Sequence, residues 1–106
     1  MGRRSQQKGR RGEIELRDIL RKYGFEEVEC GEPQSYGAVP DLVGLHDVHV
    51  EAKRCEQMRL WEWMQQAVRD AERFKDGVPV LFHRRNRQGW LVTMNLADWV
   101  ELYRKK

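Results

Sequence analysis

The sequence predicts one domain of the α/β or α+β class, with a mixed central sheet flanked by helices. Three segments carry apolar residues at helical spacing, and five short segments are apolar or alternate between apolar and polar residues. The longest helical segment lies between two of the predicted strands. With 106 residues, 40% of them hydrophobic, the chain can build one hydrophobic core and is too short for two.

The N-terminal part of the chain is predicted to form a helix, a strand and a loop. Apolar side chains recur at helical spacing over residues 12–23, and Gly24 stands where such a helix ends. Residues 25–30 alternate between apolar and acidic side chains, as a half-buried strand does. The following residues, 31–39, are rich in Gly, Pro, Gln and Ser and are expected to form a loop.

A hairpin of two strands, over residues 41–45 and 48–53, is predicted next. Asp41 begins the first of these strands, and Glu51 and Lys53 lie two residues apart on the second. Because side chains alternate along a strand, Glu51 and Lys53 project from the same face. A carboxylate and an ammonium group are therefore expected side by side in the sheet.

The remaining elements complete the order helix, three strands, helix, two strands, helix. An apolar stripe predicts a long helix over residues 59–75. Two apolar strands, 78–84 and 90–94, are joined by a turn at 86–89, and residues 96–103 have a last helical period. A helix that connects two strands of one sheet usually joins parallel neighbours and packs on one face.

The charged residues of the hairpin have the composition of a metal site. Charges at central positions of a covered sheet are costly unless they are paired or bind a cation. Asp41 and Glu51, with the backbone carbonyl of Ala52, supply the hard oxygen ligands that Mg²⁺ prefers. Such a site leaves positions for water and a phosphate oxygen, which indicates phosphodiester hydrolysis.

Two acids of the first helix flank its apolar stripe. Glu13 is spaced with Leu16, Leu20 and Tyr23, so we expect it to point toward the sheet. Glu15 lies on the other edge of the stripe and is expected to be solvated. A small error in helix phase would exchange these two roles.

The N-terminus is strongly basic. Residues 1–11 contain five basic side chains and no acid, in a chain of net charge +3. These side chains are Arg3, Arg4, Lys8, Arg10 and Arg11. We expect a flexible arm over 1–11 that binds a polyanion, with nucleic acid as the first candidate and a solubility tail as the alternative, and a single folded domain over 12–106.

Two motifs resemble those of a known superfamily. Pro40 and Asp41, nine residues, and then Glu51, Ala52 and Lys53 resemble the signature of the PD-(D/E)XK nucleases. The run from Lys8 and Gly9 to Glu13 resembles the opening of Holliday junction resolvases and of small phage-encoded nucleases in that superfamily. The order of elements along the whole chain agrees with this resemblance, which implies a restriction-endonuclease-like core.

The resemblance also implies roles for individual residues. Asp41 and Glu51 would bind Mg²⁺ or Mn²⁺, with Glu13 helping directly or through water, and Lys53 would orient or activate the attacking water. Relatives often carry a glutamine on the helix after the lysine. Gln66 flanks the apolar stripe, whereas Gln65 lies almost opposite it, so Gln66 is the better candidate.

Other clusters were weighed for binding roles. The basic strand end with Arg84, Arg85 and Arg87 is a candidate phosphate-contacting rim. The spacing of the residues that could form a zinc site disfavours one; these are Cys30, Cys55, His46 and His49. Trp61 and Trp63 cannot both face the core stripe of their helix, so at least one is expected to be exposed, at a dimer contact or a nucleic-acid surface.

The sequence therefore predicts a metal-dependent DNA endonuclease, with branched or duplex DNA as substrate and a homodimer as the natural assembly. The alternative is a non-catalytic DNA-binding or accessory module of the same fold. RNA cleavage, and the use of one metal or two, are left open. No apolar run approaches the roughly 20 residues that span a bilayer, and no signal peptide is evident, so we expect a cytoplasmic protein of bacterial or phage origin.

Overall fold

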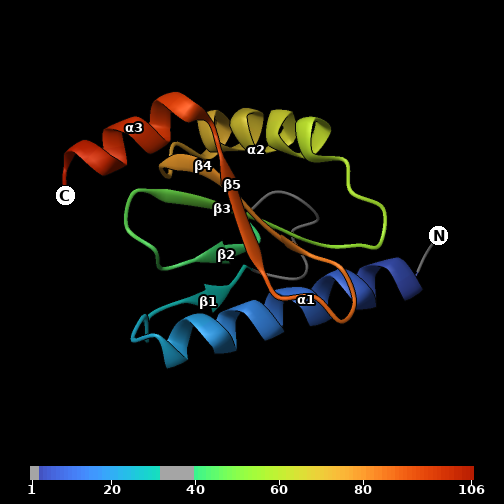
Figure 1. Ribbon diagram of the computed structural model, residues 1–106. Helices are drawn as coiled ribbons and strands as arrows, with labels where there is room; N and C mark the ends of the chain where they lie inside the picture. Colours follow the sequence, from blue (N-terminus) through green and yellow to red (C-terminus); the bar gives the residue numbers. More distant parts are fainter. Residues whose placement is uncertain (1–2, 32–39) are drawn as a thin grey trace.

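The elements follow the predicted order in the computed structural model, which describes residues 3–31 and 40–106, with side chains from Arg10 onward. Residues 32–39 of the predicted loop (31–39) lie outside the described residues. The elements, which Figure 1 labels, are α1 (Arg3–Lys22), β1 (Glu29–Cys30), β2 (Leu42–Val43), β3 (Val48–Arg54), α2 (Leu60–Phe74), β4 (Val78–Arg84), β5 (Leu91–Met94) and α3 (Leu96–Arg104).

The five strands form one mixed sheet in the order β1-β2-β3-β4-β5. β3 and β4 are parallel, with Val50 paired to Val80, and the other neighbours are antiparallel. α2 connects the two parallel strands, as the sequence predicts. α1 lies on one side of the strands and α2 on the other (Figure 1). The predicted class, α+β with a mixed central sheet and flanking helices, is confirmed.

The two faces of β3 differ in chemistry. Val50 is buried against α1 in a core with Leu16, Val28 and Leu42. The alternate residues of β3, among them His49 and Glu51, face α2 instead, where they are almost fully buried. The sheet therefore has an apolar face under α1 and a partly polar face under α2.

The first helix begins earlier than the sequence predicts. Residues 1–11 are expected to form an arm, but α1 already begins at Arg3. Arg, Gln and Lys are good helix formers, and extending a helix that is already packed from Gly12 onward costs little. The backbone of residues 3–11 is therefore helical where an arm is predicted, and the flexibility of this segment and its binding of a polyanion stay predictions.

The first two strands are shorter than predicted. The strand expected over 25–30 is reduced to β1, because the Val28 amide bonds back to the Phe25 carbonyl in a turn. β2 ends at Gly44, whose φ of +103° favours glycine. A Cβ at Gly44 would lie 2.3 Å from the Glu27 carbonyl oxygen, so the tight approach also requires glycine.

No helix among the described residues is both long and apolar enough to cross a membrane.

Candidate active site

Asp41 lies at the start of β2, directly beside β3. Continuing the Leu42–Val50 register by one residue places Asp41 opposite Glu51. The Asp41 Oδ2 atom accepts a hydrogen bond of 2.8 Å from the Ala52 amide. Pro40 then falls opposite Ala52 and has no N–H to donate, so the Ala52 carbonyl receives no ladder hydrogen bond from that position. The local backbone leaves a carbonyl oxygen beside two acids.

Glu51 and Lys53 share one face of β3, as strand alternation predicts. The Lys53 Nζ atom lies 3.6 Å from Glu51 Oε1, and Glu51 is only 4% exposed. Lys53 also lies over the ring of Trp63 from α2, 6.0 Å from its centroid. One ammonium group and one carboxylate are thus held together under α2, with the lysine closer to solvent.

Glu13 approaches this pair from α1. Its carboxylate is 3.5 Å from Arg10, and its side chain is 20% exposed. Burial raises the pKa of Glu13, and the charge of Glu51 raises it further, although Arg10 opposes both. Glu13 therefore lies close enough to Glu51 to feel its charge, as expected for an acid that points toward the sheet.

The surroundings of Asp41 raise its pKa strongly. Burial, followed by the charges of Glu51 and Glu13, raises the pKa of Asp41 to about 7, against the opposing Ala52 amide and Lys53. Three carboxylates thus converge with one lysine and one arginine around them. The site has more negative charge than its own cations compensate, which is the condition under which a buried acid cluster binds a metal ion.

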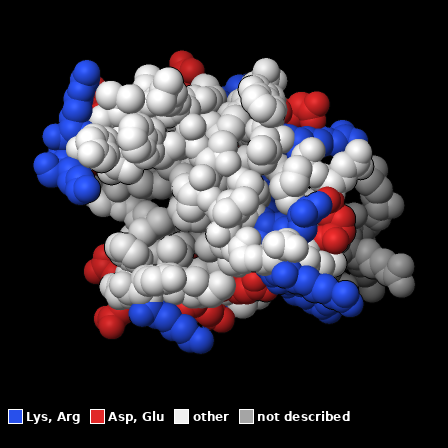
Figure 2. Space-filling view, viewed as in Figure 1, with Lys and Arg blue, Asp and Glu red and all other residues white. Residues whose placement is uncertain are grey.

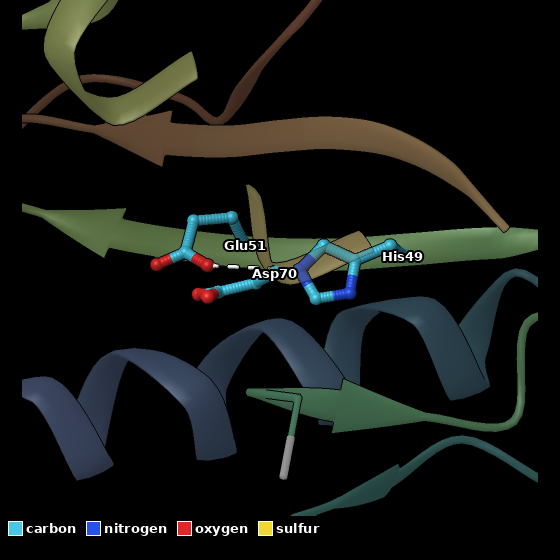
Figure 3. Close-up of side chains that lie close together, drawn as sticks. All are labelled: His49, Glu51 and Asp70. Atoms are coloured by element: carbon cyan, nitrogen blue, oxygen red, sulfur yellow. Dashed lines mark ion pairs between the residues drawn. The ribbon is translucent and has the colours of Figure 1, made fainter. Parts of the chain in front are cut away.

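The structure adds two acids and a histidine around Glu51. Nitrogen or oxygen atoms of His49, Glu51 and Asp70 all lie within 4.8 Å of one another, and Figure 3 shows the three side chains grouped beside β3. Among the described residues, Asp41 and Glu13 do not belong to this tight group. Asp76, just after α2, lies 2.9 Å from His49 Nδ1.

Neither His49 nor Asp70 is among the site residues that the sequence predicts. The signal was available in the spacing of α2. Trp63, Gln66 and Asp70 recur at intervals of three and four residues and therefore share one side of the helix. Since Trp63 contacts Lys53 and Asp70 adjoins Glu51, Gln66 lies on the same side.

The imidazole of His49 is almost fully buried between acids. Burial by itself lowers the pKa of His49, but Glu51 and Asp76 outweigh it and raise that pKa overall. The His49 ring also stacks on Phe74, with centroids 6.1 Å apart. This histidine is held on both sides, by Asp76 and by the aromatic ring.

Gln66 is half-buried and Gln65 is exposed. Gln65 instead lines an apolar surface pocket of about 350 Å³ with Trp61, Met64 and Val68. The side of α2 that carries Gln66 is the side nearest the acids, so the preference for Gln66 remains a prediction that the geometry favours.

Glu15 is only partly solvated and is paired within the protein, which corrects the expectation for this residue. Its carboxylate pairs with Arg84 at 2.7 Å and with Arg54 at 3.3 Å, and it accepts a hydrogen bond of 2.9 Å from Trp90 Nε1. Burial raises the pKa of Glu15, but the hydrogen bonds from Arg84 and Trp90 lower it overall. The sequence did not show this pairing because Arg54 and Arg84 come from β3 and β4, which meet Glu15 of α1 only in the fold.

Arg84 therefore differs from its two neighbours in the predicted rim. Its guanidinium also donates to the carbonyls of Arg85 and Gln88, and its side chain is 14% exposed. Arg85 and Arg87 are exposed. Arg85 and Arg87 are therefore accessible to a ligand, whereas the guanidinium of Arg84 is already bonded within the protein.

The basic N-terminal residues are described only in part. Arg10 pairs with Glu13 and donates to the Gly31 carbonyl at 3.1 Å, whereas Arg11 is exposed. The side chains of Arg3, Arg4 and Lys8 lie outside the described ones. Trp61 is 81% exposed, which agrees with the expectation that one tryptophan of α2 faces solvent.

The residues considered for zinc do not gather. Cys30 and Cys55 are free thiols, and His46 is exposed. Among the residues that the structure describes, only His49 of the four belongs to a group of three or more close donors.

Residues 4–106 match a family described as "Phage putative PDDEXK endonuclease". No match was found among curated proteins.

Proposed function

Because the chain belongs to this phage PDDEXK endonuclease family, we propose that it is a metal-dependent endonuclease that hydrolyses phosphodiester bonds in DNA. The observation that carries the proposal is the convergence of Asp41, Glu51 and Glu13 beside Lys53. An acid with a pKa of about 7 is only about half ionised at neutral pH, and a bound cation would favour its charged form. A pure DNA-binding module gains nothing from such acids, which would repel phosphate.

The donor set fits Mg²⁺ or Mn²⁺. Asp41 and Glu51 offer carboxylate oxygens, the Ala52 carbonyl lacks a ladder donor at Pro40, and Glu13 would bind directly or through water. When bound, the ion supplies positive charge beside the phosphate and lowers the pKa of a water molecule. The Ala52 amide holds Asp41 in place for this role.

Lys53 has the position of a residue that acts on the reacting groups. Its ammonium is fixed by Glu51 on one side and by the Trp63 ring on the other. A cation held there orients the attacking water and stabilises the negative charge that develops on the phosphate. Gln66, on the same side of α2, is proposed to help position the water or the phosphate.

Exposed arginines are proposed to grip the nucleic acid. Arg11, Arg85 and Arg87 are accessible, and Arg3, Arg4 and Lys8 extend the basic stretch of α1. Arg10 would act close to the site, since it already pairs with Glu13. These contacts give affinity without base specificity, because they neutralise phosphates.

We propose a homodimer, with α3 as part of its interface. α3 has no buried residue, and most of its large apolar side chains are exposed, including Trp99 at 48% and Leu96 at 75%. An isolated helix of nine residues is not stable in water, so this surface calls for a partner. Figure 2 shows a broad area without charged side chains over β5 and α3. Two sites in one dimer would suit a branched DNA substrate.

The proposal is tested by incubating the purified protein with Mg²⁺ or Mn²⁺ and labelled junction, flap, duplex and single-stranded DNA, with matching RNAs. Cleavage that disappears in EDTA and in Asp41→Ala is expected, and the substrate panel identifies the preferred structure. Binding without cleavage of any DNA or RNA would overturn the nuclease in favour of an accessory module. Sedimentation of the same samples tests the dimer.

A further inference from the structure

The buried imidazole of His49 has one nitrogen that the protein leaves without a partner. Its Nδ1 atom lies 2.9 Å from both carboxylate oxygens of Asp76. Because a carboxylate accepts hydrogen bonds, Nδ1 carries the proton in this contact. The opposite nitrogen, Nε2, is buried and has no hydrogen-bond partner among the described residues. It lies 3.8 Å from Glu51 Oε2, too far for a hydrogen bond.

This nitrogen faces two carboxylates. Glu51 comes from the same face of β3, two residues along, and Asp70 comes from α2. One donor atom from each of the three residues lies within 4.8 Å of the others. Figure 3 shows the Glu51 and Asp70 carboxylates together on the side of β3 where the His49 ring lies.

The spacing suits a metal ion. Bond lengths of about 2.1 Å to nitrogen and oxygen place tetrahedral ligand atoms about 3.4 Å apart, so small rotations of these side chains suffice. A carboxylate that holds the far nitrogen of a ligating histidine, as Asp76 does, fixes the ring orientation and makes the ligand more basic. A buried, oriented and unpartnered nitrogen is what distinguishes this group from an ordinary acidic cluster.

The donor chemistry selects the ion. Mg²⁺ prefers oxygen ligands and keeps its waters, whereas an imidazole nitrogen beside carboxylates suits first-row transition ions such as Mn²⁺, Co²⁺ and Zn²⁺. The Asp41 side of Glu51 offers only oxygen donors. The two sides of Glu51 therefore differ in the cation that they favour.

We propose that His49, Glu51 and Asp70, with Asp76 orienting the imidazole, form a second cation site that prefers a divalent transition ion to Mg²⁺. This proposal rests on the proposed function only through Glu51, which would bind a cation both in this site and in the site with Asp41. The competing interpretation is a purely structural group, in which a protonated His49 pairs with Glu51 and Asp76 and no ion binds.

The test uses the full chain without a polyhistidine tag, freed of metal and titrated with Co²⁺ by calorimetry and by visible absorption. We expect the wild type to bind Co²⁺ with an absorption change that excess Mg²⁺ does not remove. Asp70→Asn, on a half-buried helical position, should weaken this binding at least tenfold, and Asp76→Asn should weaken it about 10–100-fold as an orienting residue. His46→Asn, at an exposed histidine, is the matched control and should bind as the wild type does.

Asp41→Asn separates this proposal from the nuclease. It should retain the Mg²⁺-resistant Co²⁺ signal even if the protein cleaves no DNA. In ¹⁵N spectra of the histidine rings, Zn²⁺ should shift Nε2 of His49 and leave His83 unchanged. Three results would each overturn the second site and leave the structural ion group: no Co²⁺ binding by the wild type, displacement of Co²⁺ by Mg²⁺, or equal Co²⁺ binding by Asp70→Asn and the wild type.

Discussion

Two clusters of charge differ in how far their acids are balanced by neighbouring cations. On the α1 side, one carboxylate, Glu15, meets two guanidinium groups and an indole N–H. Around Glu51 and Asp41, acids outnumber the nearby cations, and the pKa of Asp41 is raised by burial and by its acidic neighbours. The pKa of Glu15 is lowered overall instead, although burial alone would raise it.

This difference distinguishes an acid with a structural role, Glu15, from acids with a functional role, Asp41 and Glu51. A buried acid whose neighbours satisfy its charge contributes to the fold and has nothing left to offer a ligand. An acid whose neighbours do not satisfy it costs stability until a cation arrives, and such groups gather at functional sites. The five changes below test that distinction.

The largest expected effect is on catalysis. Lys53→Met should lower kcat/KM for DNA cleavage by about 10²–10³-fold, the usual effect of removing one group that stabilises charge in a transition state. The substitution keeps the length of the side chain over Trp63. Initial rates measure it, and Lys22→Met, at the exposed end of α1, should cleave normally. A fully active Lys53→Met would mean that Lys53, like Arg84, has only a structural role.

The balanced cluster should respond in stability. Glu15→Ala leaves Arg54 and Arg84 without their carboxylate, and we expect a loss of about 2 kcal/mol in the free energy of unfolding, reduced from a fully buried pair because Glu15 is partly exposed. Urea denaturation measures it, with exposed Glu26→Ala as the control. Activity per folded molecule should not change. A loss of cleavage without a loss of stability would contradict the comparison.

Without metal, removing an acid from the unbalanced cluster should raise the stability of the protein, whereas removing Glu15 should lower it. The pKa of Asp41 rises from 3.8 to about 7 on folding, so the folded state holds this proton more tightly than the unfolded chain. Stability of the metal-free protein should therefore fall as pH rises through that window. In EDTA, Asp41→Asn should be more stable than the wild type by roughly 1–2 kcal/mol at pH 8, with no gain near pH 4.

Thermal and urea unfolding at several pH values measure this gain. Asp47→Asn, at an exposed acid whose positive φ asparagine tolerates, is the control. If Asp41→Asn were less stable than the wild type at pH 8 in EDTA, the acid would be satisfied by the protein itself. Mn²⁺ should reverse the order of the two proteins.

Gln66 and Gln65 offer a smaller test within α2. Gln66→Ala should lower kcat/KM about tenfold, the effect of one lost hydrogen bond worth about 1.4 kcal/mol. Gln65→Ala should leave it unchanged, because Gln65 faces solvent. Equal effects of both substitutions would mean that the helix acts as a scaffold only.

The smallest effect is expected from the exposed arginines. Arg87→Ala should weaken DNA binding and reduce the slope of log K against log salt by about 1, since one phosphate contact is lost. Binding is measured by fluorescence anisotropy at several salt concentrations, with Ca²⁺ in place of Mg²⁺. Arg85→Ala should behave alike. An unchanged slope would remove these residues from the DNA surface.

The sequence predicted what depends on local pattern. Periodicity located α2, β4 and the hairpin, and strand alternation paired Glu51 with Lys53. It did not predict how short β1 and β2 are. The local turn from Phe25 to Val28 interrupts an alternating pattern that is typical of a strand, and the close contact of Gly44 with Glu27 exists only where two chain segments meet in the fold. For the same reason, the role of Glu15 was missed.

The site was predictable to the same extent. Asp41 and Glu51 lie on adjacent strands, so a hairpin brings them together. Asp70 and Asp76 reach His49 only because α2 returns across the sheet before β4. Contacts of this kind depend on how a helix packs, which a helical wheel restricts but does not determine.

The central claim is that the unbalanced acids serve a cation in catalysis and the balanced one does not. The most direct test compares cleavage of one labelled DNA by Glu51→Gln and Glu15→Gln in Mg²⁺, at equal concentrations of folded protein. We expect Glu51→Gln to fold and not to cleave, and Glu15→Gln to cleave at the wild-type rate. Cleavage by Glu51→Gln at the wild-type rate, or loss of cleavage in Glu15→Gln alone, would contradict it.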